Sequence, residues 1–352
     1  MTASAPAGSM RAAVFHEPGQ PMSIEDVPIP TPLDHQVVIS VSHCGICGSD
    51  LHLTEDPAFT MPPGSILGHE FAGEVAAVGA GVASVKVGDR VTALPISGCG
   101  SCEICRAGYY NGCDQFSFLQ GGYAQYVLAA EDSCLKLPRS VSLADGALVE
   151  PMAVGLHAVR TSGLKPGANV LVIGAGPIGL AATYAARRMG AGKIAVTASS
   201  SRRADLSHLV GADHFFVNDD QALGRAYDAF GGLPDVVIEC VGIPGLIELA
   251  VQAVRPRGTV VVAGFCRQAD TFTPVVAVYK EIRMLFSVLY GIHDFQDSID
   301  MLDADADTLR SMVTHTVDLA GFPAAFDELR SRSQQCKVLL DPWRVSTPSE
   351  ER

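Results

Sequence analysis

The sequence predicts an α/β protein in which a mostly β domain is joined to a doubly wound parallel sheet. The first part of the chain, up to about residue 148, consists of short β-like runs separated by Gly and Pro turns. These runs include residues 37–41, 73–78 and 123–128. From about residue 153, apolar runs alternate with helical segments, as buried parallel strands do. Those runs cover residues 168–173, 193–197, 235–239 and 258–263.

The length supports two domains, because 352 residues with 48% hydrophobic side chains suffice for two cores. We expect a dinucleotide-binding domain at residues 156–291. It is inserted between residues 1–155 and 292–352, which form the other, catalytic domain. After about residue 291 the chain again reads as helix and short strand, and we expect this tail to return to the first domain.

The charge excludes several partners. The chain has 25 basic and 38 acidic side chains, a net charge of −13, which would repel nucleic acid and anionic lipid. No run is long and apolar enough to cross a bilayer. The first ten residues lack the basic and apolar regions of a signal peptide. We therefore expect a cytoplasmic protein with reduced thiols and no nucleic-acid or membrane partner.

Four cysteines lie within fifteen residues, in a lobe at about residues 95–115. They are Cys99, Cys102, Cys105 and Cys113. Two-residue gaps on tight turns suit tetrahedral Zn²⁺, whose Zn–S bonds are about 2.3 Å long. Four protein ligands leave no open position, so this zinc would be structural. Chance spacing or a disulfide pair is the alternative, and the absence of a secretion signal argues against it.

A glycine-rich turn follows the first apolar run of the second part. It consists of Gly174, Ala175, Gly176, Pro177, Ile178 and Gly179, and it opens an Ala-rich helix at residues 180–188. In that context the glycines let a pyrophosphate approach the backbone and the helix N-terminus. The turn predicts a Rossmann cofactor site, and the alternative is an ordinary turn of an α/β domain.

A second group of potential metal ligands lies upstream. It is spread over residues 44–52, with Cys44, Cys47 and His52, and over residues 68–70, with His69 and Glu70. A catalytic zinc needs about three protein ligands and one open position, and thiolate, imidazole and carboxylate from separate segments could supply them. By spacing alone, core or surface roles for these residues stay open.

Together these motifs resemble the zinc-containing medium-chain dehydrogenase/reductases, the family of alcohol, sorbitol and threonine dehydrogenases. The resemblance covers nearly the whole chain in family order. It runs from residues 10–15 through 68–70, 88–91, the four-cysteine lobe, Glu150-Pro151 and the glycine turn to residues 337–342. It implies a GroES-like catalytic domain, a Rossmann domain, a small alcohol or carbonyl substrate, two zinc ions per chain, and a homodimer or homotetramer.

Residue by residue, the resemblance makes Cys47 and His69 ligands of the catalytic zinc, with Glu70 and Glu150 as carboxylates that bind it alternately or through water. Cys44 is the less favoured ligand. Ser49 and His52 would form a proton relay, and Asp50 would orient the His69 ring. Glu150 stands where liver-type alcohol dehydrogenases have a third cysteine, which points toward the polyol and secondary-alcohol branch.

The second strand of the Rossmann part predicts the cofactor. An NAD site normally carries an acidic residue about 20 residues after the glycine turn, and Ala198 stands about there. Four nearby side chains could hold a 2′-phosphate, namely Ser199, Ser200, Arg202 and Arg203, and this run resembles the NADP-binding stretch of cinnamyl alcohol dehydrogenases. We therefore expect NADP(H). NAD(H) is the alternative, in which both arginines merely begin the next helix.

Three function classes follow. The leading one is a zinc-dependent alcohol dehydrogenase or ketone reductase, either NADP-preferring or, alternatively, an NAD-dependent polyol or threonine-type enzyme. The second is a zinc-free reductase of the same fold acting on activated double bonds, which does not require Cys47, His69 and Glu150. The third is a non-catalytic nucleotide-binding protein.

Overall fold

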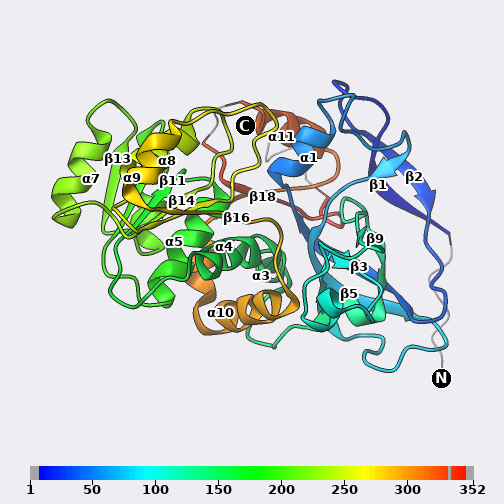
Figure 1. Cartoon of the computed structure of the whole chain (residues 1–352). Coiled ribbons are helices and arrows are strands. Elements are labelled where there is room, and N and C mark those ends of the chain that lie inside the picture. The colour runs from blue at the N-terminus through cyan, green and yellow to red at the C-terminus, as the bar shows by residue number, and fades with distance from the viewer. Residues whose placement is uncertain (1–7, 332–333, 346–352) are drawn as a thin grey trace. The chain divides into compact units, whose positions relative to one another are not determined.

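The computed structural model describes residues 8–331 and 334–345, so most of the N-terminal stretch weighed above as a possible leader lies outside it. The chain divides into two compact units (Figure 1). Unit 1 comprises Met1–Glu150 and Phe295–Arg352, and unit 2 comprises Pro151–Asp294. The ends expected for the dinucleotide-binding segment, residues 156 and 291, lie within a few residues of these changeovers.

Unit 1 is built around a mixed sheet in the order β10-β6-β5-β3-β18-β17, with β9 also paired to β3. Its central strand β3 carries Val37, Val38, Ile39 and Val41, all fully buried, so the strand is covered on both faces. The C-terminal strand β18 pairs antiparallel with β3 and parallel with β17. The strands of this sheet are β3 (Gln36–Gly45), β5 (Glu70–Val78), β6 (Arg90–Ala93), β9 (Tyr126–Ala130), β10 (Cys134–Lys136), β17 (Val313–Val317) and β18 (Lys337–Leu340).

Two smaller sheets complete unit 1. One has the order β2-β1-β4, and the other is the antiparallel pair β7-β8, which closes the base of the four-cysteine lobe. Their strands are β1 (Ser9–Phe15), β2 (Ser23–Pro28), β4 (Ser65–Ile66), β7 (Ile96–Ser97) and β8 (Ser117–Phe118). The helices are α1 (Gly48–Leu53), α2 (Glu103–Arg106), the 3₁₀ turn η1 (Glu131–Ser133), α3 (Leu143–Gly146), α10 (Ile292–Arg310) and α11 (Phe322–Glu328).

Unit 2 is a six-stranded parallel sheet in the order β13-β12-β11-β14-β15-β16. This 3-2-1-4-5-6 order is that of the doubly wound dinucleotide-binding fold, and it confirms the predicted fold class. Figure 1 shows α5 and α8 on opposite faces of the sheet. The strands are β11 (Val170–Ile173), β12 (Ile194–Ala198), β13 (His214–Val217), β14 (Val236–Glu239), β15 (Thr259–Val262) and β16 (Arg283–Phe286). The helices are α4 (Val149–Ser162), α5 (Pro177–Arg188), the 3₁₀ turn η2 (Ser201–Arg203), α6 (Ala204–Leu209), α7 (Ala222–Phe230), α8 (Leu246–Ala253) and α9 (Pro274–Lys280).

The sequence did not predict β13 and β16, the two outer strands of this sheet. Outer strands are partly exposed, and neither β13 nor β16 has a fully buried residue. Their sequences, His-Phe-Phe-Val and Arg-Met-Leu-Phe, therefore lack the continuous β-branched run that marks the inner strands. Among the residues that the structure describes, no helix is long and apolar enough to span a membrane.

Candidate active site

The four lobe cysteines come together. The Sγ atoms of Cys99, Cys102, Cys105 and Cys113 all lie within 4.8 Å of one another. Backbone N–H groups donate to these sulfurs, as from Cys99 N to Cys113 Sγ (3.3 Å) and from Cys102 N to Cys99 Sγ (3.3 Å). Such donors stabilise thiolates, and so this sulfur set fits a tetrahedral metal. All ten cysteines lie among the described residues, and all are free thiols.

The lobe sulfurs lie in different electrostatic surroundings. Hydrogen bonds from Ser101 and from the Cys102 amide lower the pKa of Cys99 to about 6. Burial raises the pKa of Cys105 to about 12. Binding of a metal to all four sulfurs would therefore have to displace the Cys105 proton, so it would be opposed by acid.

A second cluster forms in unit 1 from the two upstream segments. Ligand atoms of Cys47, His69 and Glu70 all lie within 4.8 Å of one another. Cys47 is the residue immediately before α1, while Glu70 begins β5 and His69 directly precedes it. His69 and Glu70 are buried and Cys47 is half-buried. One thiol, one imidazole and one carboxyl make a donor set that suits zinc.

His69 faces a buried carboxylate. Its Nδ1 lies 3.4 Å from Asp50 Oδ1, and both atoms are buried without a hydrogen-bond partner of good geometry. Burial acts to lower the pKa of His69, but Asp50 and Cys47 raise it well above its usual value. With Nδ1 directed at Asp50, Nε2 is the nitrogen available to a metal, which is the arrangement expected of a metal-bound histidine.

Glu70 is already paired with a residue that sequence reasoning missed. Lys337 Nζ lies 2.7 and 2.5 Å from the two Glu70 carboxylate oxygens and donates to Ile46 O at 3.0 Å. Both side chains of the pair are buried. Burial acts to lower the pKa of Lys337, but Glu70 and Cys47, with Glu150, raise it. A lysine at the start of an otherwise apolar strand was the available signal.

The other predicted site residues take different positions. Ser49 Oγ donates to Cys47 Sγ at 3.2 Å, and His52 is half-buried on the same helix, α1. Glu150 is 5% exposed, and the structure does not bring its carboxylate into the Cys47–His69–Glu70 cluster. Phe118, which the sequence did not single out, packs edge-on against the His69 ring with centroids 5.0 Å apart.

The glycine turn of unit 2 follows β11 and opens α5, with Pro177 in the first turn of the helix. Gly174 has φ +109°, and a Cβ on Gly179 would lie 1.9 Å from Gly174 O, so neither position tolerates a side chain. Above Gly176 the space is open apart from Arg203, whose Nη1 lies 4.0 Å from the position of an added Cβ. This open backbone beside a guanidinium fits a pyrophosphate at the helix N-terminus.

The end of β12 carries the residues predicted to select the cofactor. The strand ends at Ala198, and Ser201–Arg203 form a 3₁₀ turn. Arg203 is half-buried and donates to Ala175 O at 3.3 Å, so it lies over the glycine turn. Arg202 is exposed to solvent.

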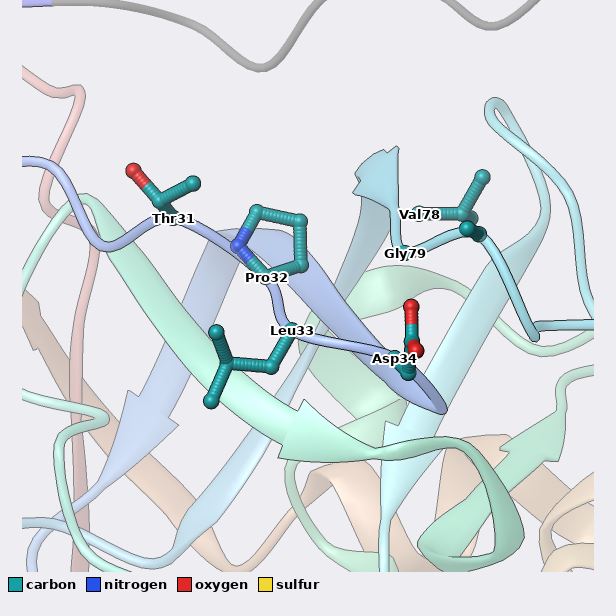
Figure 2. A pocket seen from close by; sticks show the side chains of 7 residues that line it. Thr31, Pro32, Leu33, Asp34, Val78 and Gly79 are labelled. Atoms are coloured by element: carbon teal, nitrogen blue, oxygen red, sulfur yellow. The ribbon is translucent and has the colours of Figure 1, made fainter.

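An open pocket of about 620 Å³ lies elsewhere in unit 1 (Figure 2). Its lining runs from Thr31 to Asp34 and from Val78 to Ala80, with Asp34 as the one charged side chain. Val78 ends the same strand that Glu70 begins, so the two places are roughly 26 Å apart at about 3.3 Å per residue. This pocket is not the candidate active site.

Comparison with known proteins identifies two family models. The model described as an alcohol dehydrogenase GroES-like domain matches residues 33–139, and the one described as a zinc-binding dehydrogenase matches residues 177–304. A protein of Aspergillus clavatus named "Probable D-xylulose reductase A" is 36% identical over 327 residues, which are 88% of this chain and 91% of that protein.

Solved structures are similar over almost the whole chain. The 2R,3R-butanediol dehydrogenase of Bacillus subtilis matches with a TM-score of 0.86 and 32% identity, covering 95% of this chain and 99% of that one. An alcohol dehydrogenase of E. coli CFT073 in complex with NADH matches with a TM-score of 0.87 and 29% identity, and the match covers 95% of this chain and 100% of that one. A Sinorhizobium meliloti protein bound to NADP matches with a TM-score of 0.85 and 29% identity, and this match also covers 95% of this chain and 100% of that one.

Proposed function

The chain belongs to the zinc-dependent medium-chain dehydrogenase/reductases, and we propose that it transfers a hydride between NADP(H) and a secondary alcohol or polyol, or the corresponding ketone or aldehyde. One observation carries this proposal, namely the convergence of Cys47, His69 and Glu70 on one small volume, with buried Asp50 behind the imidazole. The relatives named as a xylulose reductase and a butanediol dehydrogenase support a polyol or secondary alcohol as the substrate class.

The chain's own residues would prepare the site for zinc. Cys47 Sγ and His69 Nε2 are the ligands proposed first, and Asp50 fixes the imidazole by facing Nδ1. Glu70 and Glu150 are the proposed carboxylates, and Lys337 balances the Glu70 charge. When bound, zinc supplies Lewis acidity that lowers the pKa of an alcohol or polarises a carbonyl.

The substrate proton needs a path to water. Ser49 and His52 lie three residues apart on α1 and so share one side of the helix, and Ser49 Oγ is already beside Cys47 Sγ. We propose that Ser49 accepts the substrate proton while it gives its own hydroxyl proton to His52, which then releases a proton to water. His52→Ala should then slow turnover less than Cys47→Ser, which removes a metal ligand, because water can partly replace a relay; such groups contribute about 10²–10⁴-fold.

The cofactor preference rests on the end of β12. A 2′-phosphate would find no carboxylate at Ala198 and would find the hydroxyls of Ser199 and Ser200 with the guanidinium groups of Arg202 and Arg203. NAD(H) is the alternative, since similar structures hold either NADH or NADP.

One experiment tests the proposed function and its alternatives. Elemental analysis should find two zinc ions per chain, one in the four-cysteine lobe and one at Cys47 and His69. Removal of the zinc ion at Cys47 and His69 with a chelator should abolish alcohol oxidation, and added Zn²⁺ should restore this activity. Turnover that survives chelation would indicate a zinc-free reductase. Two bound zinc ions without turnover on any alcohol or ketone would indicate a non-catalytic protein.

We also propose a homodimer as the smallest assembly, formed through the outer strand β16. Val278, Tyr279 and Phe286, on α9 and β16, are 70%, 86% and 70% exposed. Residues 274–290 carry two basic side chains and one acidic one, whereas the chain as a whole carries −13. Like-charge repulsion between two copies is therefore weak at this segment. Light scattering on Tyr279→Asp should show loss of the dimer.

We further propose a cytoplasmic location, where the thiol ligands stay reduced.

A further inference from the structure

Three buried side chains form a line that ends at the candidate zinc site. Tyr123 donates from its hydroxyl to Asp50 Oδ2 at 2.5 Å, and Asp50 Oδ1 lies 3.4 Å from His69 Nδ1. Tyr123 and Asp50 are fully buried, and His69 is 3% exposed. The three residues come from separate segments of unit 1, so the fold alone brings them together.

The position of the Tyr123 side chain is set from several sides. Its amide donates to Leu67 O at 2.9 Å, and its carbonyl accepts from Ala13 N at 2.8 Å. Its ring packs against Phe322 and Phe326, with centroids 4.7 and 6.2 Å away. The ring and hydroxyl therefore cannot shift without moving the core of unit 1.

The chain also leaves no room between Tyr123 and the segment that carries His69. Gly68, directly before His69, has φ +91°, and a Cβ there would lie 2.6 Å from the Tyr123 ring. Gly122 donates its amide to Gly68 O at 2.8 Å, and a Cβ on Gly122 would lie 3.0 Å from the same oxygen. The backbone of the ligand segment is thus packed directly on the tyrosine.

Asp50 depends on this hydroxyl. A buried carboxylate needs donors to keep its charge and its orientation. The Tyr123 hydroxyl donates to Asp50 Oδ2, whereas His69 Nδ1 faces Oδ1 at 3.4 Å without a hydrogen bond of good geometry, so Tyr123 is the donor that holds the carboxylate. Burial, followed by the charge of Asp50, raises the pKa of Tyr123 well above its usual value, so the hydroxyl remains a donor.

We propose that Tyr123 is a positioning residue of the catalytic zinc site, acting on His69 through Asp50. This inference rests on the proposed function, because it requires a metal at Cys47 and His69. The tyrosine holds the carboxylate in the one rotamer that faces Nδ1, and the carboxylate in turn holds Nε2 toward the metal. Loss of the Tyr123 hydroxyl leaves the ligands Cys47 and His69 in place, but it frees the Asp50 carboxylate, which orients His69.

Zinc release measures this role without reference to turnover. We would follow release to a colorimetric chelator from wild type, Tyr123→Phe, Asp50→Ala and the double variant. Partners behind a metal-bound histidine typically contribute 10–100-fold to metal affinity, so Tyr123→Phe should release the catalytic zinc about tenfold faster. In the Asp50→Ala background, Tyr123→Phe should have little further effect on zinc release, because the carboxylate that the tyrosine holds is absent.

Two controls separate positioning from general loosening of the fold. The zinc of the four-cysteine lobe, in the same chain, should leave Tyr123→Phe and wild type at the same rate. Tyr184→Phe removes another buried tyrosine hydroxyl, on α5 in unit 2, and should leave both rates unchanged. If Asp50→Ala fails to fold, the visible spectrum of the cobalt-substituted protein replaces the cycle. Tyr123→Phe should shift the bands of the catalytic cobalt, and Tyr184→Phe should not.

The outcomes distinguish this inference from the proposed function. Faster release from the catalytic site alone, absent in the Asp50→Ala background, supports the inference. Unchanged release in Tyr123→Phe, equal acceleration at both zinc sites, or the same acceleration in the Asp50→Ala background would overturn it and leave the proposed function intact. A wild-type protein that binds zinc only in the cysteine lobe would overturn both.

Discussion

Replacement of Lys337 by methionine should strongly destabilise unit 1. The lysine is 2% exposed and the Glu70 side chain opposite it is 1% exposed, with N–O distances of 2.7 and 2.5 Å. Methionine has a similar length but no charge, so the variant leaves the buried Glu70 carboxylate without the cation that pairs with it. Removal of one partner of a buried ion pair costs about 3–5 kcal/mol, because the remaining charge is uncompensated.

The same reasoning predicts a rescue. Replacement of the second partner, as in Lys337→Met with Glu70→Gln, removes the uncompensated charge and should recover most of the loss, because a buried pair contributes little net stability over neutral residues. Lys136→Met is the matched control, since its partner Asp89 lies 2.9 Å away but the lysine side chain is 55% exposed. That change should cost less than about 1 kcal/mol.

The chain offers a specific probe for this measurement. Its one tryptophan, Trp343, lies in unit 1, donates to Val41 O at 2.8 Å and packs on Tyr126. Its fluorescence during denaturant unfolding therefore reports the unit that contains Lys337. The measurement uses zinc-free protein, so that bound metal cannot neutralise Glu70. A loss below about 1 kcal/mol in Lys337→Met, or a double variant no more stable than the single one, would refute the reasoning.

Three further predictions concern other parts of the chain. Cys102→Ser should lose one zinc per chain and melt at a lower temperature in calorimetry, because metal affinity at such a site is folding free energy; unchanged melting and metal content would contradict a zinc in the lobe. Arg202→Ala should raise the Kd for NADP(H) by about tenfold to a hundredfold with little effect on NAD(H), because Arg202 is exposed at the end of β12 and does not lie over the glycine turn. Ala198→Asp should favour NAD(H), and a wild-type preference for NAD(H) in kcat/KM would disprove the NADP assignment. Asp145 is 1% exposed and accepts hydrogen bonds from Arg310 at 2.9 and 2.7 Å. Burial acts to raise the pKa of Asp145, but the hydrogen bonds from Arg310 and Ser142 lower this pKa below its ordinary value of 3.8. The charged form of Asp145 thus stabilises the fold above pH 3.8, and this stabilisation is lost as the pH falls through the lower pKa of the folded state. Asp145→Asn should therefore lower the free energy of unfolding by roughly 2 kcal/mol at pH 7 and by progressively less below pH 4. A loss in denaturant unfolding that does not depend on pH would contradict this role of Asp145.

Local patterns in the sequence were enough for the fold class, for the place of the glycine turn and for the clustering of the four lobe cysteines. The glycine turn lies between a buried strand and a helix that are its immediate neighbours, and the four lobe cysteines fall within fifteen residues. Backbone geometry and ligand spacing over such short distances depend on the residues themselves. The outer strands β13 and β16 were missed because partial exposure relaxes the demand for β-branched residues.

The surroundings of the candidate catalytic residues were decided by the tertiary structure alone. Lys337 and Glu70 are 267 positions apart, and Tyr123 and Asp50 are 73 positions apart. No periodicity or spacing links such residues, because their contact depends on how distant segments of unit 1 pack against one another. The sequence alone therefore determined which side chains are available as ligands. Only the fold determined which charges and hydroxyls surround those ligands, because burial requires each buried charge to find a partner from whatever segment lies next to it.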